Sequence, residues 1–219
     1  MVQKLKQKVM DGKEITKEEA MTLAEADLDE LCQAADEIRK HFCGNVFDIC
    51  SCINVKGGKC SEDCKFCPQS CFNDKVEVKP HTLIGSDQMF EEAAYMAQKG
   101  VVRCDLVSSG RRLPKDDVQK IVQDIERIRK ETGIAVCCSF GLLDQEDCEM
   151  LRKAGITRLH NNLESSRTFF TGVCSSHSTD DKMATLRAAR AAGLTLCSGC
   201  LINLGESMED RIGLALMER

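Results

Sequence analysis

Residues 53–70 read INVKGGKCSEDCKFCPQS, an apolar stretch that runs directly into three closely spaced cysteines. The spacing is C-x3-C-x2-C, formed by Cys60, Cys64 and Cys67, and an aromatic residue, Phe66, precedes the third cysteine. Three thiolates on one short loop can hold three irons of a [4Fe–4S] cube. The fourth iron is then free of protein and can bind a reactant, whereas a fully ligated cluster can only store or pass electrons.

Two closed sites are the alternative interpretations of this run. If Cys71 were a fourth ligand, the spacing would approach the bacterial ferredoxin run, but the first gap is one residue longer and Phe72 replaces the proline. Structural zinc sites usually show two well separated C-x2–4-C pairs, and here there is one compact cluster. The run therefore favours the open, three-ligand cluster.

Composition and charge exclude several classes of protein. The chain has 219 residues, a net charge of −5 and no basic run, so nucleic-acid binding has no electrostatic support. No apolar stretch is long enough to span a membrane, and the charged N-terminus does not resemble a signal peptide. Fifteen cysteines without an export signal indicate iron–sulfur chemistry in a reducing, cytoplasmic compartment rather than disulfides. We expect part of the surplus to act as small apolar packing residues, namely Cys32, Cys43, Cys148 and Cys174.

The first 45 residues carry helix signals. Thr16 and Glu19 form a capping-box pattern, and apolar residues recur at helical spacing from Leu28 to Ile38. We therefore expect two helical stretches in an N-terminal extension over residues 1–45.

From residue 46 onward, strand and helix patterns alternate. The expected strands cover residues 46–55, 101–107, 134–140, 156–163 and 194–202. The expected helices cover residues 86–100, 114–133, 144–154 and 180–192, and a last one starts after Ser207. Such alternation predicts a parallel sheet with helices outside it, and on pattern alone a doubly wound sheet and a β/α barrel both fit.

The cysteine motif resembles that of the radical S-adenosylmethionine (SAM) enzymes. The wider run 53–70, and the spacing of the later strands and motifs, resembles the biotin synthase family from about Asp27 to the last residue. The resemblance implies an α/β fold of the (β/α) TIM-barrel type, in which reactive groups lie at the C-terminal ends of the strands. About five of the eight βα units are present, so we expect an incomplete barrel over residues 46–219. A partial barrel that dimerises to cover its open edge is the alternative.

The resemblance also implies cofactors, activity and partners. In this family the open iron binds SAM, an electron from the cluster cleaves it, and the resulting 5′-deoxyadenosyl radical abstracts hydrogen from dethiobiotin. Sulfur from an auxiliary cluster, [2Fe–2S] or a variant of it, then completes biotin. No catalytic side chain is implied beyond the cluster and SAM. The implied partners are dethiobiotin, a flavodoxin or ferredoxin electron donor and a second copy of the chain in a homodimer, with no nucleic acid and no membrane.

Cofactor and substrate positions can be carried over residue by residue. The resemblance assigns SAM-binding positions to Phe66, Ser109, Gly110, Glu164 and Ile202 and a substrate-binding position to Asn162. Glu164 stands where the family has aspartate, so its backbone placement must differ. We interpret His160, where the family has asparagine, as a histidine satisfied by hydrogen bonds inside the barrel.

The resemblance also implies an auxiliary cluster. Its usual ligands in the family are three cysteines, on the second, third and fifth strands, and one later arginine. Cys137 and Cys197 match two of these positions, but the second-strand position holds Asp105, and Cys104 is its neighbour. Because neighbouring strand residues point to opposite faces, Cys104 replaces the missing ligand only if a bulge shifts the register.

Two further thiols lie close to these positions. We expect Cys200 or Cys104 to join Cys137 and Cys197 in a differently ligated cluster. Because Cys137 and Cys138 are neighbours on one strand, they should not both face the lumen. The alternative to a role for Cys138 in the cluster is that it faces the helices as an inert small residue.

Two other functions remain open at this point. One is a related radical SAM enzyme that acts on another small molecule without a sulfur-donor cluster. The other is a non-catalytic iron–sulfur module. Iron and sulfide content separates the three functions. The biotin synthase type predicts two clusters, the related radical SAM enzyme one open cluster, and the non-catalytic module one closed site.

Overall fold

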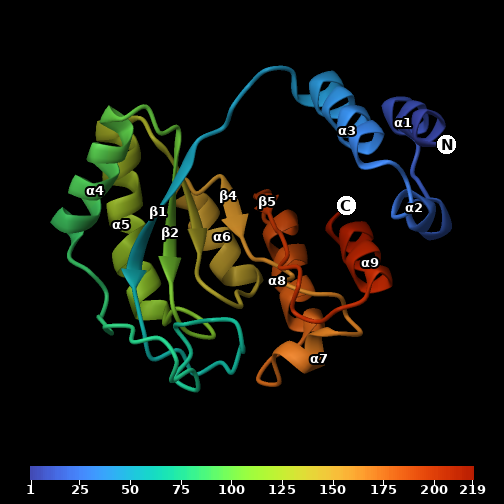
Figure 1. The fold of residues 1–219 in the computed structure, drawn as a ribbon. Coiled ribbons are helices and arrows are strands. Elements are labelled where there is room, and N and C mark those ends of the chain that lie inside the picture. The colour runs from blue at the N-terminus through green and yellow to red at the C-terminus, as the bar shows by residue number, and fades with distance from the viewer. The chain divides into compact units, whose positions relative to one another are not determined.

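The computed structural model describes residues 1–219, which form two compact units, residues 48–201 and residues 1–47 together with 202–219. The larger unit contains the sheet and the cysteine loop (Figure 1). The predicted division into residues 1–45 and 46–219 stays a prediction.

The larger unit alternates strands and helices. Its elements are β1 (Cys50–Lys56), α4 (Ser86–Gln98), β2 (Arg103–Ser108), α5 (Lys115–Thr132), β3 (Ala135–Ser139), α6 (Gln145–Lys153), β4 (Arg158–His160), α7 (Phe170–Val173), α8 (Thr179–Ala191) and β5 (Thr195–Cys197). Each predicted strand and helix of this region is present, although β4 and β5 are shorter than predicted. The short helix α7 was not predicted.

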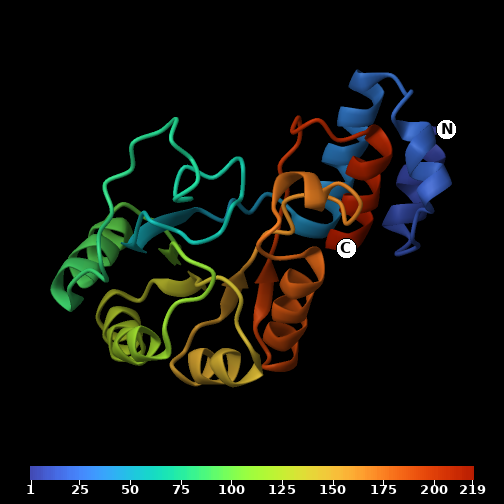
Figure 2. The same cartoon turned by 90° about the horizontal axis from the view of Figure 1, so that it is seen from below.

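The winding of the sheet decides between the two folds that the pattern left open. All neighbouring strands are parallel, and their spatial order is β1-β2-β3-β4-β5, the order of the sequence. Figure 2 shows α4, α5, α6 and α8 together on the outer face of the curved sheet. A doubly wound sheet has helices on both faces and reverses its strand order, whereas a barrel winds in one direction. The prediction of an incomplete β/α barrel is confirmed.

Helix α5 illustrates how local sequence builds the outer layer. Pro114 precedes its first turn, and Gly133 ends it in the left-handed conformation at φ 74°. Ile121, Ile125 and Ile128 recur at helical spacing and are fully buried. Burial of this apolar stripe against the sheet stabilises the helix more than its intrinsic propensity does.

Strand β1 shows which face of the sheet is open. Ile53 and Val55 are completely buried, while Cys50, Cys52 and Asn54, which alternate with them, are exposed. Because side chains alternate along a strand, the exposed set shares the inner, lumen face and the buried set packs under the helices.

The smaller unit is helical. It contains α1 (Val2–Met10), α2 (Lys17–Leu23), α3 (Leu28–Cys43) and α9 (Met208–Glu218). Thr16 and Glu19 form the predicted capping box of α2, and Ser207 begins α9 with a second one. Helix α1 was not predicted.

The helices of the chain are too short or too polar for a bilayer. None combines the length and the hydropathy that a membrane span requires.

Candidate active site

The cysteine loop between β1 and α4 is closed by backbone hydrogen bonds. The amide of Cys60 donates to the carbonyl of Gln69 at 2.8 Å, and the amide of Cys71 donates to the carbonyl of Cys60 at 2.9 Å. Within the loop, the amide of Cys67 donates to the carbonyl of Cys64 at 3.0 Å. These bonds draw the three motif cysteines together at the C-terminal end of the sheet.

The three motif thiols border one cavity of about 580 Å³. Cys60, Cys64 and Cys67 are each half-buried and line it, whereas Cys71 is exposed and does not. Burial raises the pKa of the Cys60 thiol. The cavity therefore receives three thiols from the loop, as the open-cluster interpretation requires.

The ends of β1 to β4 and the loops after them supply the rest of this cavity, as expected at the C-terminal ends of barrel strands. Its other lining residues include the lumen residues Cys52 and His160 and, from the loops and α8, Ser109, Gly110, Arg111, Asn161, Glu164, His177 and Lys182. Its volume lies in the range of small-molecule sites, about 300–1,000 Å³.

Ser109 and Gly110, for which the resemblance predicts contacts with SAM, both line the cavity. The Ser109 amide donates to the Lys56 carbonyl at 2.8 Å, and its hydroxyl donates to the Gly58 carbonyl at 2.9 Å. These bonds fix the loop after β2 beside the start of the cysteine loop. Gly110 has φ 113°, a conformation that residues with a Cβ avoid.

Glu164 lines the cavity in a strained backbone conformation. Its φ is 66°, in the left-handed region that non-glycine residues rarely adopt. Its amide donates to the Gly199 carbonyl at 3.1 Å, and its carbonyl accepts from the Leu201 amide at 2.9 Å. The loops after β4 and β5 thus hold this glutamate in place, and such strain is typical of functional sites.

Three predicted positions lie outside this cavity lining. Phe66 is half-buried in the cysteine loop, and Asn162 contacts His160, whereas its neighbour Asn161 lines the cavity. Ile202 belongs to the smaller unit and is 57% exposed. Their predicted contacts with cofactor or substrate stay predictions.

A second polar cluster lies on the lumen face of the strands. His160 Nδ1 is 3.0 Å from Asp105 Oδ2, and its Nε2 is 2.9 Å from Asn162 Oδ1. The hydrogen bond to Asp105 raises the pKa of His160, although burial opposes this. Both ring nitrogens are satisfied, as expected for this histidine from the sequence.

Strand register places several thiols around Asp105. Cys52 on β1 and Cys137 on β3 are both its direct partners, and Cys197 on β5 is the partner of His160. Residues in register on parallel strands share a face, so these thiols face the lumen. Burial raises the pKa of Cys137 strongly, and the nearby Asp105 carboxylate adds to the shift.

Sequence reasoning missed the two β1 thiols. Cys50 and Cys52 are two residues apart on the lumen face of β1, and that alternation was the signal available in the sequence. The family resemblance implies cluster ligands on the second, third and fifth strands and therefore does not point to β1.

Cys104 and Cys138 lie on the opposite face of the sheet. Both are completely buried, and they alternate with the lumen residues Asp105 and Cys137. Burial is the main cause that raises the pKa of Cys104 to about 12. Burial also raises the pKa of Cys138, which lies near Cys148 of α6. The sheet has no bulge between β2 and β3 that would turn Cys104 inward.

The remaining surplus cysteines divide by exposure. Cys200 is exposed beside Glu164 at an isolated bridge, and Cys32 and Cys43 are also exposed, unlike the packing residues expected from the sequence. Cys148 is buried as expected for a packing residue. Cys174 is buried too, but it has polar neighbours that the sequence did not indicate.

Two acidic residues inside the motif anchor the cysteine loop to the segment between α7 and α8. Asp63 accepts from the backbone amides of Ser175 and Ser176 at 2.8 and 3.0 Å and from the Ser175 hydroxyl. The Ser175 hydrogen bonds hold the pKa of Asp63 far below its usual range. Glu62 Oε2 is 2.7 Å from His177 Nδ1 and 3.3 Å from the Arg111 guanidinium.

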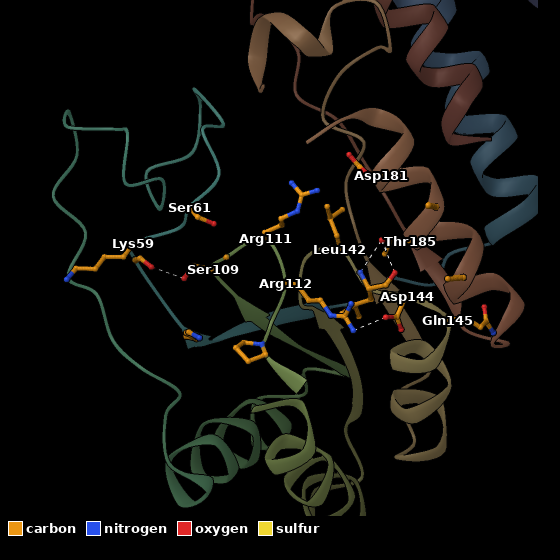
Figure 3. Close-up of a pocket in the computed structure, with 17 residues that line it drawn as sticks. Lys59, Ser61, Ser109, Arg111, Arg112, Leu142, Asp144, Gln145, Asp181 and Thr185 are labelled. Atoms are coloured by element: carbon orange, nitrogen blue, oxygen red, sulfur yellow. Dashed lines mark hydrogen bonds and ion pairs between the residues drawn. The ribbon is translucent and has the colours of Figure 1, made fainter. Parts of the chain in front are cut away.

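A neighbouring cavity of about 770 Å³ has no cysteine in its lining. Figure 3 shows it between the loops after the strands and α8, with Arg112 paired to Asp144. The Leu143 amide donates to the Thr185 hydroxyl at 3.1 Å, and both residues line the cavity. It contains neither a thiol nor a histidine, so the chemistry of this face is concentrated in the cysteine cavity.

Solved structures of other proteins share this fold. Methylornithine synthase (PylB) superposes with a TM-score of 0.81 at 24% identity, over 98% of this chain and 63% of that one. The FeFe-hydrogenase maturase HydG from Carboxydothermus hydrogenoformans gives a TM-score of 0.78 at 19% identity, over 97% of this chain and 51% of that one. At these identities the likeness concerns the fold alone.

Sequence comparisons identify the family of the chain. The radical SAM superfamily profile matches residues 54–217. Biotin synthase 2 of Corynebacterium diphtheriae is 50% identical over all of this chain and 66% of its own length, and biotin synthase of Brachyspira hyodysenteriae is 46% identical over 97% and 63%. Biotin synthase of Clostridium botulinum is 43% identical over 99% of this chain and 68% of its own length. The chain spans about two thirds of the length of these relatives, and it belongs to the biotin synthase family of the radical SAM superfamily.

Proposed function

We propose that this chain carries the cluster-binding and SAM-binding part of a biotin synthase. The observation that carries the proposal is the cavity at the C-terminal end of the sheet. The three motif thiols of the loop reach it, and the neighbouring Cys71 does not. A cubane held there would keep one iron free of protein. When bound, the cluster and SAM together supply a 5′-deoxyadenosyl radical.

The side chains of the cavity suit the polar groups of SAM. Ser109 and Gly110 present backbone at the wall of the cavity, and Arg111 adds a positive charge for a carboxylate. Glu164, held by the loops after β4 and β5, offers a carboxylate to a ribose diol. These residues bind and orient; none of them exchanges a proton in the proposed chemistry.

The substrate that the family relationship suggests is dethiobiotin. We place it deeper in the lumen than SAM, near Asn162 and His160, whose hydrogen bond to Asp105 fixes the imidazole ring. A reactive radical needs a site from which water is excluded. Positioning of the unactivated C–H bonds is therefore the main task of the protein.

We further propose that the lumen holds the auxiliary iron–sulfur cluster through Cys137 and Cys197. The second-strand position holds Asp105, whose Oδ1 is buried without a hydrogen-bond partner and is thus available as an oxygen ligand. Cys52 is the partner of Asp105 on β1 and offers a further thiol. The donor set around Cys137 therefore fits a cluster with a ligand set unlike three cysteines and an arginine.

The wider proposals derive from the family relationship. We propose a flavodoxin or ferredoxin as electron donor, a homodimer as the assembly, and the cytoplasm as the location. Residues 1–45 are proposed to be an extension of the barrel domain formed by residues 46–219.

Iron and sulfide analysis after anaerobic reconstitution tests the first cluster. Cys64→Ala removes one of the three ligands, so we expect it to lose this cluster, whereas Cys71→Ala keeps it. In the wild-type protein the electron paramagnetic resonance signal of the reduced cluster should change when SAM is added. Loss of the cluster in Cys71→Ala, or a signal that ignores SAM, would refute the open site.

The auxiliary cluster needs a separate test. Cys137→Ala and Cys197→Ala should each lower iron and sulfide by the content of one cluster and leave the response to SAM intact. Cys138→Ala and Cys104→Ala are matched controls, because these thiols face the helices. If only one cluster is ever present, the enzyme belongs to the alternative class that acts without a sulfur donor.

A further inference from the structure

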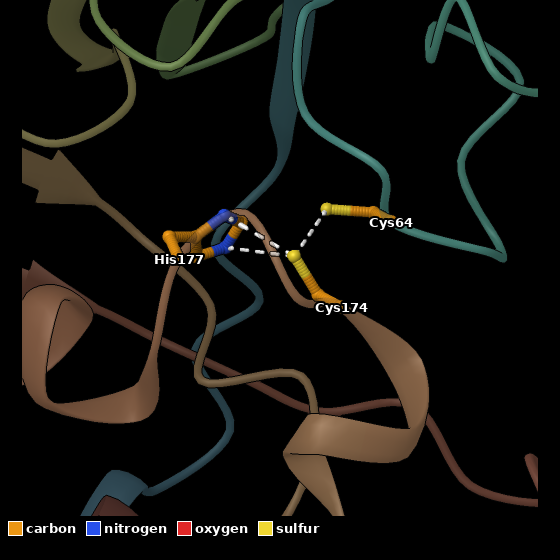
Figure 4. A group of neighbouring side chains, drawn as sticks. All are labelled: Cys64, Cys174 and His177. Carbon is orange, nitrogen blue, oxygen red and sulfur yellow. Dashed lines mark hydrogen bonds between the residues drawn. The ribbon is translucent and has the colours of Figure 1, made fainter.

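Cys64, Cys174 and His177 form a compact group of metal-binding side chains (Figure 4). Cys64 comes from the cysteine loop, and the other two come from the segment between α7 and α8, more than a hundred residues later. The sulfur of Cys174 points toward both the Cys64 sulfur and the His177 ring. Their ligand atoms all lie within 4.8 Å of one another.

The distances match a single tetrahedral ion rather than a cube. Zinc–sulfur and zinc–nitrogen bonds of about 2.3 and 2.05 Å at tetrahedral angles place two sulfurs about 3.8 Å apart and a sulfur and nitrogen about 3.6 Å apart. Here Cys64 Sγ and Cys174 Sγ are 3.7 Å apart, and Cys174 Sγ is 3.3 Å from His177 Nδ1. Ligands on different irons of a cube are separated by much more, because two irons and a bridging sulfide lie between them.

The surroundings of the group suit a bound cation. The Asp63 carboxylate, whose Oδ1 is 3.2 Å from Cys174 Sγ and accepts from the Ser175 and Ser176 amides, places a negative charge beside the two thiols. Cys174 is 2% exposed, and the His177 side chain is 6% exposed, so bulk water reaches them poorly. If His177 Nδ1 turns to a metal, Glu62 keeps the Ser176 hydroxyl at 2.9 Å and the Arg111 guanidinium as partners. Two thiolates this close together are stabilised by a divalent cation, which supplies the missing positive charge.

We propose that Cys64, Cys174 and His177 bind one thiophilic divalent metal ion, of the Zn²⁺ type, when the [4Fe–4S] cluster is absent. Binding deprotonates the two thiols and releases two protons to solvent. Because Cys64 is also a proposed cluster ligand, the mononuclear site and the complete cluster exclude each other. The ion therefore holds the cysteine loop against the α7–α8 segment and must leave before the cluster is assembled.

The metal site can be tested independently of the proposed cluster. The double variant Cys60→Ser/Cys67→Ser lacks two cluster ligands and keeps the three ligands of the mononuclear site. Titrated anaerobically with Co²⁺, it should develop the visible absorption of a tetrahedral ion and a thiolate charge-transfer band, and Zn²⁺ should abolish both. Adding Cys174→Ser or His177→Gln should remove one equivalent of tightly bound Co²⁺.

Two controls account for the other thiols of this cysteine-rich chain. Cys148→Ser removes a buried thiol that lies on α6, away from the group, and should leave the stoichiometry unchanged. Cys137→Ser reports any binding in the lumen. An unchanged stoichiometry in both Cys174→Ser and His177→Gln would overturn the proposal.

Competition with the cluster is the second measurement. One equivalent of Zn²⁺ added before reconstitution should lower the iron incorporated into the wild-type protein, and Cys174→Ser should remove that inhibition while still forming the cluster. Equal inhibition in Cys174→Ser would show that Zn²⁺ acts elsewhere and would refute the shared ligand. If no variant forms a cluster, the proposed function fails, yet the Co²⁺ titration still decides the metal site.

Discussion

Gly141 occupies a turn beside the cysteine cavity in which no side chain fits. Its φ is 78°, and a Cβ built there would lie 2.2 Å from the carbonyl oxygen of Arg111. The same two loops are joined by a hydrogen bond from the Leu142 amide to the Arg111 carbonyl at 2.8 Å. A side chain at this position would therefore separate the loop after β2 from the loop after β3 and displace Arg111.

We expect Gly141→Ala to destabilise the chain more than an ordinary glycine substitution. Gly133→Ala is the matched control, because Gly133 is also left-handed at φ 74° but has nothing within 4 Å of its Cβ position. The control should lose about 1–2 kcal/mol of unfolding free energy from backbone strain alone, and Gly141→Ala at least about 2 kcal/mol more from the backbone clash. Urea unfolding measures both, and equal losses would show that the loops move apart freely.

Among the single elements, α6 is tied to the loop after β2 through its first turn. The Asp144 carboxylate accepts from the Asp147 amide at 3.0 Å, and the Asp147 carboxylate accepts from the Asp144 amide at 3.2 Å. Arg112 reaches Asp144 at 2.9 Å and the buried Asp147 at 2.5 Å. One capping box thus begins the helix and also anchors a wall of the neighbouring cavity.

Removing this cap should weaken the larger unit by a predictable amount. We expect Asp144→Ala to lower the free energy of unfolding by about 1 kcal/mol, the usual cost of losing a side-chain cap. Asp144→Asn, which keeps an acceptor for the Asp147 amide, should lose clearly less. Chemical denaturation followed by far-ultraviolet circular dichroism compares the two, and equal losses would mean that the Arg112 ion pair outweighs the cap.

The same cap predicts a pH dependence in the acid range. The hydrogen bond from the Asp147 amide, followed by Arg112, lowers the pKa of Asp144 below its ordinary value of 3.8. A group with a lowered pKa in the folded state stabilises the fold above its unfolded pKa, and this stability is lost as the pH falls through the folded value. As the pH is lowered through this range, Asp144→Asn should therefore lose less stability than the wild-type chain. If the wild-type chain and Asp144→Asn lose the same free energy of unfolding across that pH range, the assignment is wrong.

Across the whole chain, the sheet of the larger unit has two free edges. β1 and β5 are each paired on one side only, whereas β3 is hydrogen-bonded to β2 and β4. β5 is also short, and Thr195 and Cys197 are exposed. Stability is therefore distributed unevenly, with the best protected strand in the middle of the sheet.

Hydrogen exchange can measure this distribution directly. We expect the amides of β3 to exchange at least about 100-fold more slowly than those of β5, because β3 opens only when strands on both sides separate. Mass spectrometry of peptides covering residues 135–139 and 195–197 provides the comparison. Similar protection of both strands would indicate that another copy of the chain covers the β5 edge, as in the dimer alternative.

Local features of the sequence were predicted well because they depend on neighbouring residues. The capping box at Thr16, the start of the last helix after Ser207 and the end of α5 at Gly133 each depend on residues only a few positions apart. Helix α1 was missed because it has no capping residue, and its first turn has no acidic side chain. The position of the cysteine loop after the first strand was also evident from the sequence.

The chemistry of the cysteine loop can be predicted without a structure, because the spacing of Cys60, Cys64 and Cys67 is a local property of the chain. The groups that meet this loop became known only from the fold. Cys174 and His177 reach Cys64 across more than a hundred residues, and Asp105 meets His160 through the register of parallel strands. Such contacts depend on how the sheet curves and where each loop returns to it. They join residues far apart in the sequence, so a local pattern of residues cannot predict them.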